Sequence, residues 1–199
     1  VSDGFTQGGT VLGRTMPGTR LRLDTRSVLV AADGQFVLAF DRDYPEMAKL
    51  HATYPDGSEE TLSYTVTKRD YEIQRIDGLP PSKVTPYSAA DMAKIAEDAK
   101  KKGAARAQIA NGTWFAESFV WPVTGIITGV FGSQRILNGE PKRPHNGVDV
   151  AAATGTDIVA PAGGLVTLAE TDMFFEGGLV FIGHGHGYRS YFMHMSRVD

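Results

Sequence analysis

Short apolar stretches separated by turn sequences occupy the first part of the chain, up to about residue 80. Asp56-Gly57 is the clearest of these turns, because the pair favours a tight hairpin turn with positive φ. Residues 32–35, with the sequence Ala-Asp-Gly-Gln, give a second turn signal. Short strands spaced this regularly indicate a small β-sandwich, of which the immunoglobulin type is one form. The strands that the pattern predicts are 21–24, 27–30, 36–40, 52–54 and 60–66.

The stretch Gly78-Leu79-Pro80-Pro81-Ser82 ends this pattern and marks a domain boundary. Beyond it, Ser88-Ala89-Ala90-Asp91 has the Ser-x-x-acid form of a helix start, with Asp in place of the usual Glu. We expect the helix to break near Gly103 or to continue toward Asn111-Gly112. The apolar residues that follow the start at helical spacing are Met92, Ile95, Ala96 and Ala99.

Short strands and glycine turns dominate again from Trp114 onward. The sequence as a whole therefore predicts a mainly β protein in three parts. These are a β-sandwich-like domain at 1–82, a helical linker at 83–112 and a further β domain at 113–199. The strands predicted in the last part are 126–128, 164–168, 179–182 and 190–195. Alternation along the last of them places four residues on one face, namely Tyr188, Ser190, Phe192 and His194.

Composition excludes several classes of function. The net charge of −3 leaves no basic footprint for nucleic acid, so we expect no nucleic-acid partner. The chain has no apolar run long enough to span a bilayer, and residues 1–4 do not open like a signal peptide. Any such segment is therefore expected outside this sequence. The absence of cysteine excludes disulfides and thiolate metal sites.

His145 and Asp149 are the residues that most directly suggest chemistry. They lie four positions apart with Gly147 between them, so a curled segment can turn both side chains onto one point. A neutral imidazole nitrogen and a carboxylate oxygen are both good zinc ligands. The alternative is a turn in which Asp149 caps backbone amides and His145 is exposed.

The surroundings of this pair resemble the lysostaphin-type zinc endopeptidases, which cut peptide crosslinks in bacterial peptidoglycan. The resemblance runs for about 80 residues, from Phe119 to the last residue, and it depends on an ordered series of motifs rather than on any one of them. The series reads FVWPVTGIITGVFG (119–132), QR and LNG (134–135 and 137–139), ATGTDIVAPAGGLV (153–166), HGHG (184–187) and SYFMHMS (190–196).

The resemblance implies a role for three residues. His145 and Asp149 match the first two zinc ligands of the family, and His194 matches a histidine that assists the catalytic water without binding the metal. Phe192 stands where the family commonly carries tyrosine, and this difference does not involve a metal ligand. The third ligand and a second catalytic histidine belong to a His-x-His pair expected beyond residue 199. The 199-residue chain is thus expected to be inactive.

His184 and His186 also have His-x-His spacing, so they are alternative candidates for the missing ligands. Each is flanked by glycine, however, and the resemblance places them in the turn before the His194 strand. We therefore expect His184 to lie in the turn or to support a ligand, rather than to bind metal. His51 alternates within an ordinary strand and has no predicted role.

Two further features have both a functional and a structural interpretation. Arg135 and Arg143 lie in the polar loop 132–144, where the resemblance would let either contact a peptide carboxylate. Equally, Asn138-Gly139 could simply turn the chain while Arg135 braces the loop. The basic run at 100–102 could contact an anionic wall polymer, but a solvated helix end is the favoured interpretation.

The function implied by the resemblance is a zinc endopeptidase acting on peptidoglycan peptide, located in the bacterial periplasm or outside the cell. The alternative is a non-catalytic relative that binds or activates other wall hydrolases. Retention of His145, Asp149 and His194 argues against it, because a binding protein has no chemical need for all three. A periplasmic carbohydrate- or peptide-binding protein is a third interpretation, which rests only on the β-rich architecture.

Overall fold

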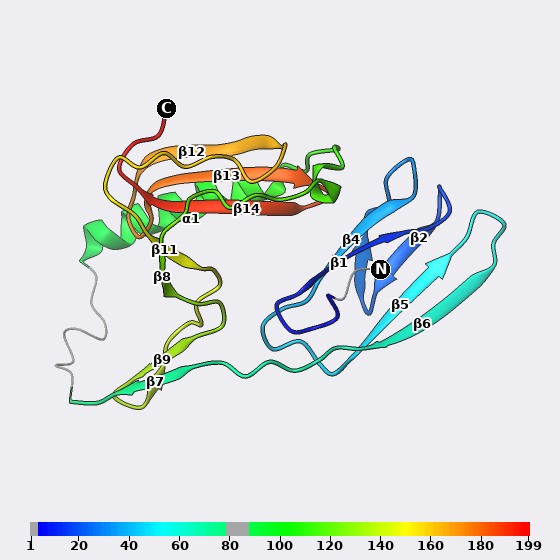
Figure 1. Cartoon of the computed structure of the whole chain (residues 1–199), viewed down its shortest axis with the longest axis horizontal. Coiled ribbons are helices and arrows are strands. Elements are labelled where there is room, and N and C mark those ends of the chain that lie inside the picture. The colour runs from blue at the N-terminus through cyan, green and yellow to red at the C-terminus, as the bar shows by residue number, and fades with distance from the viewer. Residues whose placement is uncertain (1–3, 79–87) are drawn as a thin grey trace. The chain divides into compact units, whose positions relative to one another are not determined.

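The computed structural model describes residues 4–78 and 88–199, and it is drawn in Figure 1. The chain divides into two compact units, the first ending at Tyr71 and the second beginning at Glu72. The sequence Pro80-Pro81, which led us to expect a boundary at residue 82, lies outside the described residues.

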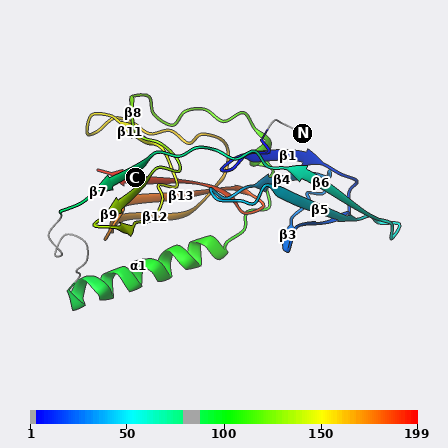
Figure 2. The same cartoon turned by 90° about the horizontal axis from the view of Figure 1, so that it is seen from below.

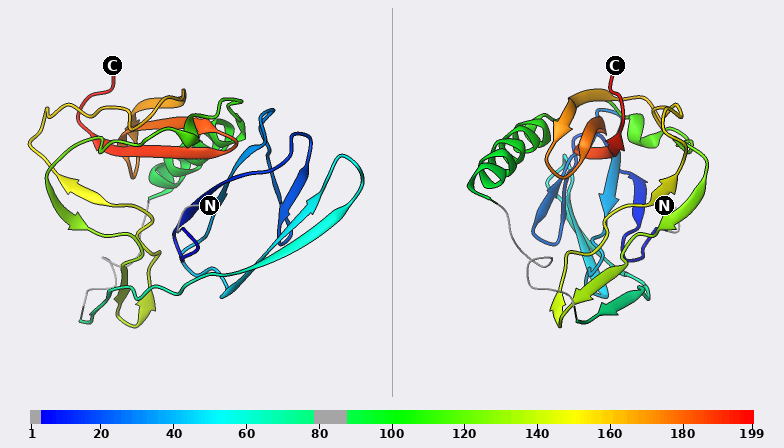
Figure 3. Two further views of the ribbon diagram at one scale, coloured as in Figure 1. Left: turned by 45° about the vertical axis from the view of Figure 1, so that its right-hand side comes forward. Right: turned by 90° about the vertical axis from the view of Figure 1, so that its left-hand side faces the viewer.

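The first unit contains a two-stranded and a four-stranded antiparallel sheet (Figure 3). Alternate side chains of these strands form one apolar core, which includes Val11, Leu38, Ala48 and Leu50. Two packed sheets around a shared core confirm the β-sandwich-like fold predicted from the alternation. The smaller sheet is β1 (Thr10–Arg14) with β4 (Gln35–Ala39), and the larger has the order β3 (Arg26–Val28), β2 (Arg20–Leu23), β5 (Met47–Thr53), β6 (Glu59–Thr65).

The turn predicted at Asp56-Gly57 joins β5 to β6. Gly57 has a φ of 85°, a conformation that costs glycine little but strains other residues. The Asp56 carboxylate accepts hydrogen bonds from both the backbone N–H and the hydroxyl of Ser58. Local turn chemistry therefore positions this hairpin, as the sequence predicts.

A three-stranded antiparallel sheet and one helix form the centre of the second unit among the described residues. Helix α1 (Ala89–Ala107) lies along one face of this sheet (Figure 2). Ala105 of the helix packs against Met173, Leu179 and Phe181 of the sheet. The strands, in their order across the sheet, are β12 (Leu165–Met173), β13 (Gly177–Gly185) and β14 (Tyr188–Met195).

The start of α1 is as predicted, with Ser88 and Asp91 forming a capping box. The break near Gly103 is wrong, because the helix continues to Ala107. A glycine inside a helix costs only about 1 kcal/mol relative to alanine, and contacts with the sheet offset this. Within the helix the buried residues are Asp98 and Ala105, whereas the predicted apolar residue Met92 is exposed.

Ionic contacts as well as apolar ones attach α1 to the sheet. Lys101 pairs with Glu170 at 3.1 Å, and Lys102 pairs with Glu176 at 2.6 Å. The basic run is thus not simply a solvated helix end, since two of its three lysines contact the protein's own acidic side chains. Lys100 is exposed.

Several short strands of the second unit were not predicted. The most unexpected pairing is parallel, between β7 (Ile73–Ile76) and β9 (Gln134–Leu137). It places residues 73–76 with the second unit, because their backbone hydrogen bonds go to β9. The remaining elements are η2 (Trp114–Ala116), β8 (Ile126–Gly129), β10 (Glu140–Pro141) and β11 (Asp149–Ala151).

The mainly β fold class is confirmed by these sheets. Within residues 4–78 and 88–199, none of the helices has the length and apolar character needed to cross a membrane.

Asp98 is the buried ionic group of the helix–sheet contact. Its carboxylate accepts hydrogen bonds from the Phe174 backbone N–H at 2.7 Å and from Lys94 Nζ at 3.0 Å. Burial disfavours the charged form, but these two donors outweigh it and lower the pKa of Asp98 below its ordinary value. The ionised carboxylate therefore stabilises the folded state.

We expect Asp98→Ala to lower the free energy of unfolding of the second unit by about 3 kcal/mol, because it removes the acceptor of the Phe174 N–H and the carboxylate that pairs with Lys94. The contribution of the charge is fully present above about pH 4, the unfolded pKa, and is lost as the pH falls through the lower folded pKa. Asp98→Asn should therefore differ from the parent more at pH 7 than at pH 3. Urea unfolding at both pH values measures this, with the exposed Glu97→Ala as control. An equal difference at both pH values would contradict the prediction.

Candidate metal centre

His145 and Asp149 converge in the structure. His145 Nε2 and Asp149 Oδ1 are 3.2 Å apart, and both side chains are partly exposed. The backbone around His145 is held at two points: its carbonyl accepts from Gly132 N–H at 2.7 Å, and its N–H donates to the Ser133 carbonyl at 2.8 Å. The curled segment expected from Gly147 therefore brings the imidazole and the carboxylate to one point.

The hydrogen bond at Nδ1 of His145 determines which ring nitrogen carries the proton. Nδ1 lies 3.2 Å from the Val130 carbonyl oxygen, which can only accept, so Nδ1 carries the proton and donates. Nε2 is then left with a lone pair that points at Asp149 Oδ1. Two acceptors this close require a shared proton or a cation between them. A histidine whose other ring nitrogen donates to a backbone carbonyl is the usual arrangement of a metal ligand, so the pair fits a zinc ion.

Asp149 is placed by the pairing of β11 with β8, in which it lies opposite Gly129. Gly129 leaves space for the carboxylate: a Cβ at this position would lie 2.3 Å from Asp149 Oδ2. Within the described part of the chain, the polar contact of the Asp149 side chain is with His145, and it caps no backbone amide. The turn-capping alternative is therefore not what the structure contains.

His194 lies at the end of β14 and is exposed. Its φ is +60°, and the register of β14 against β13 shifts by one residue between Phe192 and Met195. Such a bulge redirects a side chain, so the strict alternation predicted through His194 is interrupted there. The His194 N–H donates to the Glu176 carbonyl oxygen at 2.8 Å, which fixes the bulge.

The structure does not gather three ligands. Among the residues it describes, no group of three or more His, Cys, Asp or Glu side chains could hold a metal ion. His145 and Asp149 are brought together, and His194 does not join them in such a group. Two protein ligands alone make a weak zinc site.

His184 and His186 are both held by contacts with other residues of the protein. His184 lies in β13 rather than in the turn and is fully buried, with Nδ1 2.6 Å from the Gly163 carbonyl and Nε2 2.9 Å from Ser190 Oγ. Both of its nitrogens are thus occupied by protein groups. His186 lies in the β13–β14 turn with a φ of +51°, and its ring contacts Phe115.

The loop that contains Arg135 and Arg143 is a hairpin of β9 and β10. Asn138 and Gly139 both have positive φ, 49° and 80°, which is the two-residue turn expected of an Asn-Gly pair. Both arginine side chains are exposed. The turn interpretation of Asn138-Gly139 is therefore confirmed, and a substrate role for either arginine stays a prediction.

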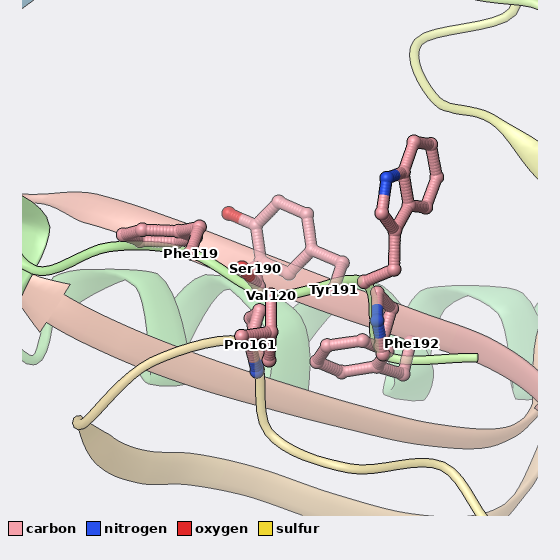
Figure 4. Close-up of a pocket in the computed structure, with 8 residues that line it drawn as sticks. Phe119, Val120, Pro161, Ser190, Tyr191 and Phe192 are labelled. Carbon is pink, nitrogen blue, oxygen red and sulfur yellow. The ribbon is translucent and has the colours of Figure 1, made fainter. Parts of the chain in front are cut away.

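An open hollow of about 360 Å³, which was not predicted, lies beside β14. Figure 4 shows Phe119, Val120 and Pro161 meeting β14 residues Ser190 to Phe192 there. The signal for this hollow in the sequence was the apolar run at 119–122. Apolar side chains that lie in a row on a surface often mark a binding site. The full lining is Phe119, Val120, Trp121, Pro122, Pro161, Ser190, Tyr191 and Phe192.

The space at Gly129 gives a direct test of the metal centre. A Cβ there would push the Asp149 carboxylate by more than the tolerance of about 0.2 Å that a metal–ligand distance allows. We expect Gly129→Ala to weaken zinc affinity by roughly 10- to 100-fold, with melting temperature nearly unchanged. Calorimetric titration with zinc measures this, on a form extended beyond residue 199 that supplies the third ligand. Gly103→Ala is the matched control, because its Cβ would meet nothing within 4 Å. Equal affinity in both variants would contradict the assignment of Asp149.

Lys102 pairs with the side chain of Glu176. The backbone carbonyl of Glu176 accepts the hydrogen bond from the His194 N–H, so this ion pair holds the residue that fixes the bulge. Both side chains are largely buried, and Glu176 Oε2 has no hydrogen-bond partner among the residues that the structure describes. We expect Lys102→Met to loosen the turn and to speed hydrogen exchange of the His194 amide about tenfold or more. Exchange measured by NMR tests this, with the exposed Lys100→Met as control. Unchanged protection at His194 would show that the ion pair does not support the bulge.

The chain is similar to known proteins. Residues 143–199 match Peptidase family M23. A crystal structure from Pseudomonas aeruginosa, named as a peptidase M23, superimposes with a TM-score of 0.70 and 25% identity, covering 98% of this chain and 75% of that one.

Two relatives match by sequence over shorter stretches. An uncharacterized metalloprotease from Haemophilus influenzae is 38% identical over 55 residues, which is 28% of this chain and 12% of the relative. A lipoprotein NlpD/LppB homolog from Pseudomonas aeruginosa is 32% identical over 80 residues, 40% of this chain and 25% of the relative. The matches thus span a quarter or less of these relatives. The resemblance to lysostaphin-type endopeptidases is confirmed to the extent that the segment 143–199, which contains His145, Asp149 and His194, matches Peptidase family M23 and the fold is similar to that of a structure named for this family.

Proposed function

We propose that this chain is part of a zinc-dependent endopeptidase that cleaves peptide crosslinks of bacterial peptidoglycan. The observation that carries the proposal is the convergence of His145 Nε2 and Asp149 Oδ1 at 3.2 Å, with Nδ1 turned to the Val130 carbonyl. Membership of the matching segment in a peptidase family supports the reaction, and a metalloprotease among the relatives supports a metal.

In this proposal the chain's own residues have distinct tasks. His145 and Asp149 bind the metal through Nε2 and a carboxylate oxygen, while the Val130 carbonyl keeps the proton on His145 Nδ1. Zinc supplies a bound water of lowered pKa and a positive charge for the oxyanion. A ring nitrogen of His194 accepts a proton from the attacking water or donates a hydrogen bond to the oxyanion.

A third ligand is needed to leave one open coordination position on a three-ligand zinc site. We expect it from a His-x-His pair outside residues 1–199. His184 is poorly suited as a substitute, because both of its ring nitrogens already bond to Gly163 and Ser190.

The hollow beside β14 supports a peptide as substrate. Its lining is mainly apolar, with Phe119, Val120 and Phe192 beside the Ser190 hydroxyl. Such a surface can bury the aliphatic part of a peptide while a polar group orients it. A location in the cell envelope is part of the same proposal, and a relative named as a lipoprotein supports it.

The non-catalytic alternative is not favoured. A protein that only binds or activates other wall hydrolases has no need of a histidine whose tautomer is set for metal binding, next to a carboxylate given space by a glycine. A carbohydrate-binding function finds no specific support in the site.

Two substitutions separate the roles of the histidines. In a form extended beyond residue 199, His145→Ala should remove both zinc and activity, because the remaining ligands bind the metal too weakly. His194→Ala should keep zinc but lower turnover by roughly 10²–10⁴-fold, the usual range for one acid–base group.

The assay is hydrolysis of purified crosslinked peptidoglycan, with zinc measured by elemental analysis on the same samples. His184→Asn serves as a control for a buried histidine, and its zinc content should stay intact. If His194→Ala lost zinc as completely as His145→Ala, His194 would be a ligand. An extended form that held zinc but cleaved no peptidoglycan would overturn the proposed substrate.

A further inference from the structure

The outer face of the four-stranded sheet in the first unit has an unusual composition. Leu21 and Leu23 of β2, and Leu50 of β5, point into the core. Because side chains alternate along a strand, their neighbours point to the opposite face. The basic residues so placed are Arg20 and Arg22 of β2 and Lys49 and His51 of β5, and we call these four the basic face.

Strand register brings the basic face together. Arg22 is directly opposite His51, and Arg20 is opposite Thr53 in the same pairing. Neighbouring strands lie about 5 Å apart and alternate residues about 7 Å apart, so successive members of the face are about 5–7 Å apart and the two end members, Arg20 and Lys49, roughly 15 Å apart at the backbone.

Hydroxyl groups surround these cations. Ser27 of β3 is opposite Arg22, and on the other side Thr61 and Ser63 of β6 are opposite His51 and Lys49. Thr61 Oγ1 lies 2.9 Å from His51 Nδ1, so this histidine is held in place. The face therefore offers several cationic and hydroxyl donors on one flat surface.

The cations of the basic face lack acidic partners within the described residues, which sets them apart in this unit. Other exposed arginines there are paired, for example Arg14 with Asp33 and Arg26 with Asp41. Two acidic residues, Glu59 and Asp24, flank the face. Glu59 lies on the edge strand β6 opposite Thr53.

Asp24 lies directly beside Lys49, but among the described residues its carboxylate forms no ion pair with a Lys or Arg of the basic face. It accepts hydrogen bonds from the Tyr44 hydroxyl and the Lys49 backbone N–H, and the Tyr44 bond is the main reason for its lowered pKa. In a chain of net charge −3, three unpaired cations gathered on one sheet face are a local concentration of positive charge.

We infer that the basic face is a docking surface for peptidoglycan, which it binds through the free carboxylates of the wall peptides. Arginine guanidinium groups match carboxylates in two-pronged geometry, and hydroxyl donors can complete the acceptor's hydrogen bonds. The choice of peptidoglycan as partner rests on the proposed function. The first unit would thereby keep the peptidase segment near its substrate by raising the local concentration.

The other anionic partners fit this face less well. Anionic membranes are usually bound by larger clusters of four to eight Lys or Arg or by an amphipathic apolar surface. Here three Lys and Arg residues are surrounded by hydroxyl groups. Charge complementarity with scattered carboxylates therefore favours the wall peptide.

The test is co-sedimentation of the full chain with purified peptidoglycan sacculi in EDTA, so that binding is measured without metal-dependent cleavage. The variant Arg20→Thr/Arg22→Thr/Lys49→Thr should bind roughly tenfold more weakly, and threonine suits a strand. The control Arg14→Thr/Arg26→Thr/Lys68→Thr changes net charge equally, in the same unit, and should bind like the parent. Melting curves check that each variant folds.

Two further arms identify the partner. Sacculi with amidated carboxyl groups should bind the parent as weakly as native sacculi bind the basic-face variant. Equal loss in both triple variants would mean general charge attraction and would overturn the inference, as would full binding to amidated sacculi. Tighter binding to phosphatidylglycerol vesicles than to sacculi would reassign the face to a membrane.

The binding test is independent of the test of the proposed function. Since the binding is measured without metal, its failure leaves the His145–Asp149 assignment untouched. Failure of zinc-dependent cleavage likewise leaves this binding result standing.

Discussion

The second unit depends on the antiparallel pairing of β13 with β12 and β14. This central strand is buried along most of its length, because neighbouring strands satisfy the backbone groups on both of its edges. Leu179 and Phe181 contribute to the core with α1, while His184 joins the Gly163 carbonyl to Ser190. The strand therefore links the helix, the loop before β12 and the strand that carries His194.

Charged groups at different depths of burial connect the helix to the same sheet. Asp98 is buried and receives the Phe174 N–H, whereas Lys102 and Glu176 pair nearer the surface. Buried ion pairs contribute little net stability against apolar packing, but they are costly to break, so they specify one position of the helix. The Glu176 carbonyl then accepts from His194, which connects the helix contact to a residue of the proposed site.

The candidate site combines a local and a non-local part. His145 and Asp149 need only a curled segment of five residues and a neighbouring strand, and they already converge at 3.2 Å. His194 depends on a bulge in a long strand and on a turn 18 residues earlier in the chain, at Glu176. This division explains why zinc binding and acid–base chemistry should respond to different substitutions.

Much of the site and fold could be predicted from the sequence where the relevant forces are local. The Asp56-Gly57 hairpin, the capping box at Ser88 and the close spacing of His145 and Asp149 all involve residues within five positions of one another. Their conformations follow from backbone sterics and short-range hydrogen bonds. The alternation of apolar residues likewise predicted the β-sandwich, because burial on one face selects that period.

Only the tertiary structure decided which groups meet across long separations. The parallel pairing of Ile73–Ile76 with Gln134–Leu137, the space at Gly129 for Asp149 and the burial of Asp98 in place of the expected apolar stripe are of this kind. His184 was assigned to a turn because its glycine neighbours suggested one, yet its strand and its two partners come from distant pairing. Residue type and spacing determine local geometry. The partner of a buried polar group depends instead on how the whole chain packs. Such a group must form a hydrogen bond, and only the complete fold decides which donor or acceptor lies next to it.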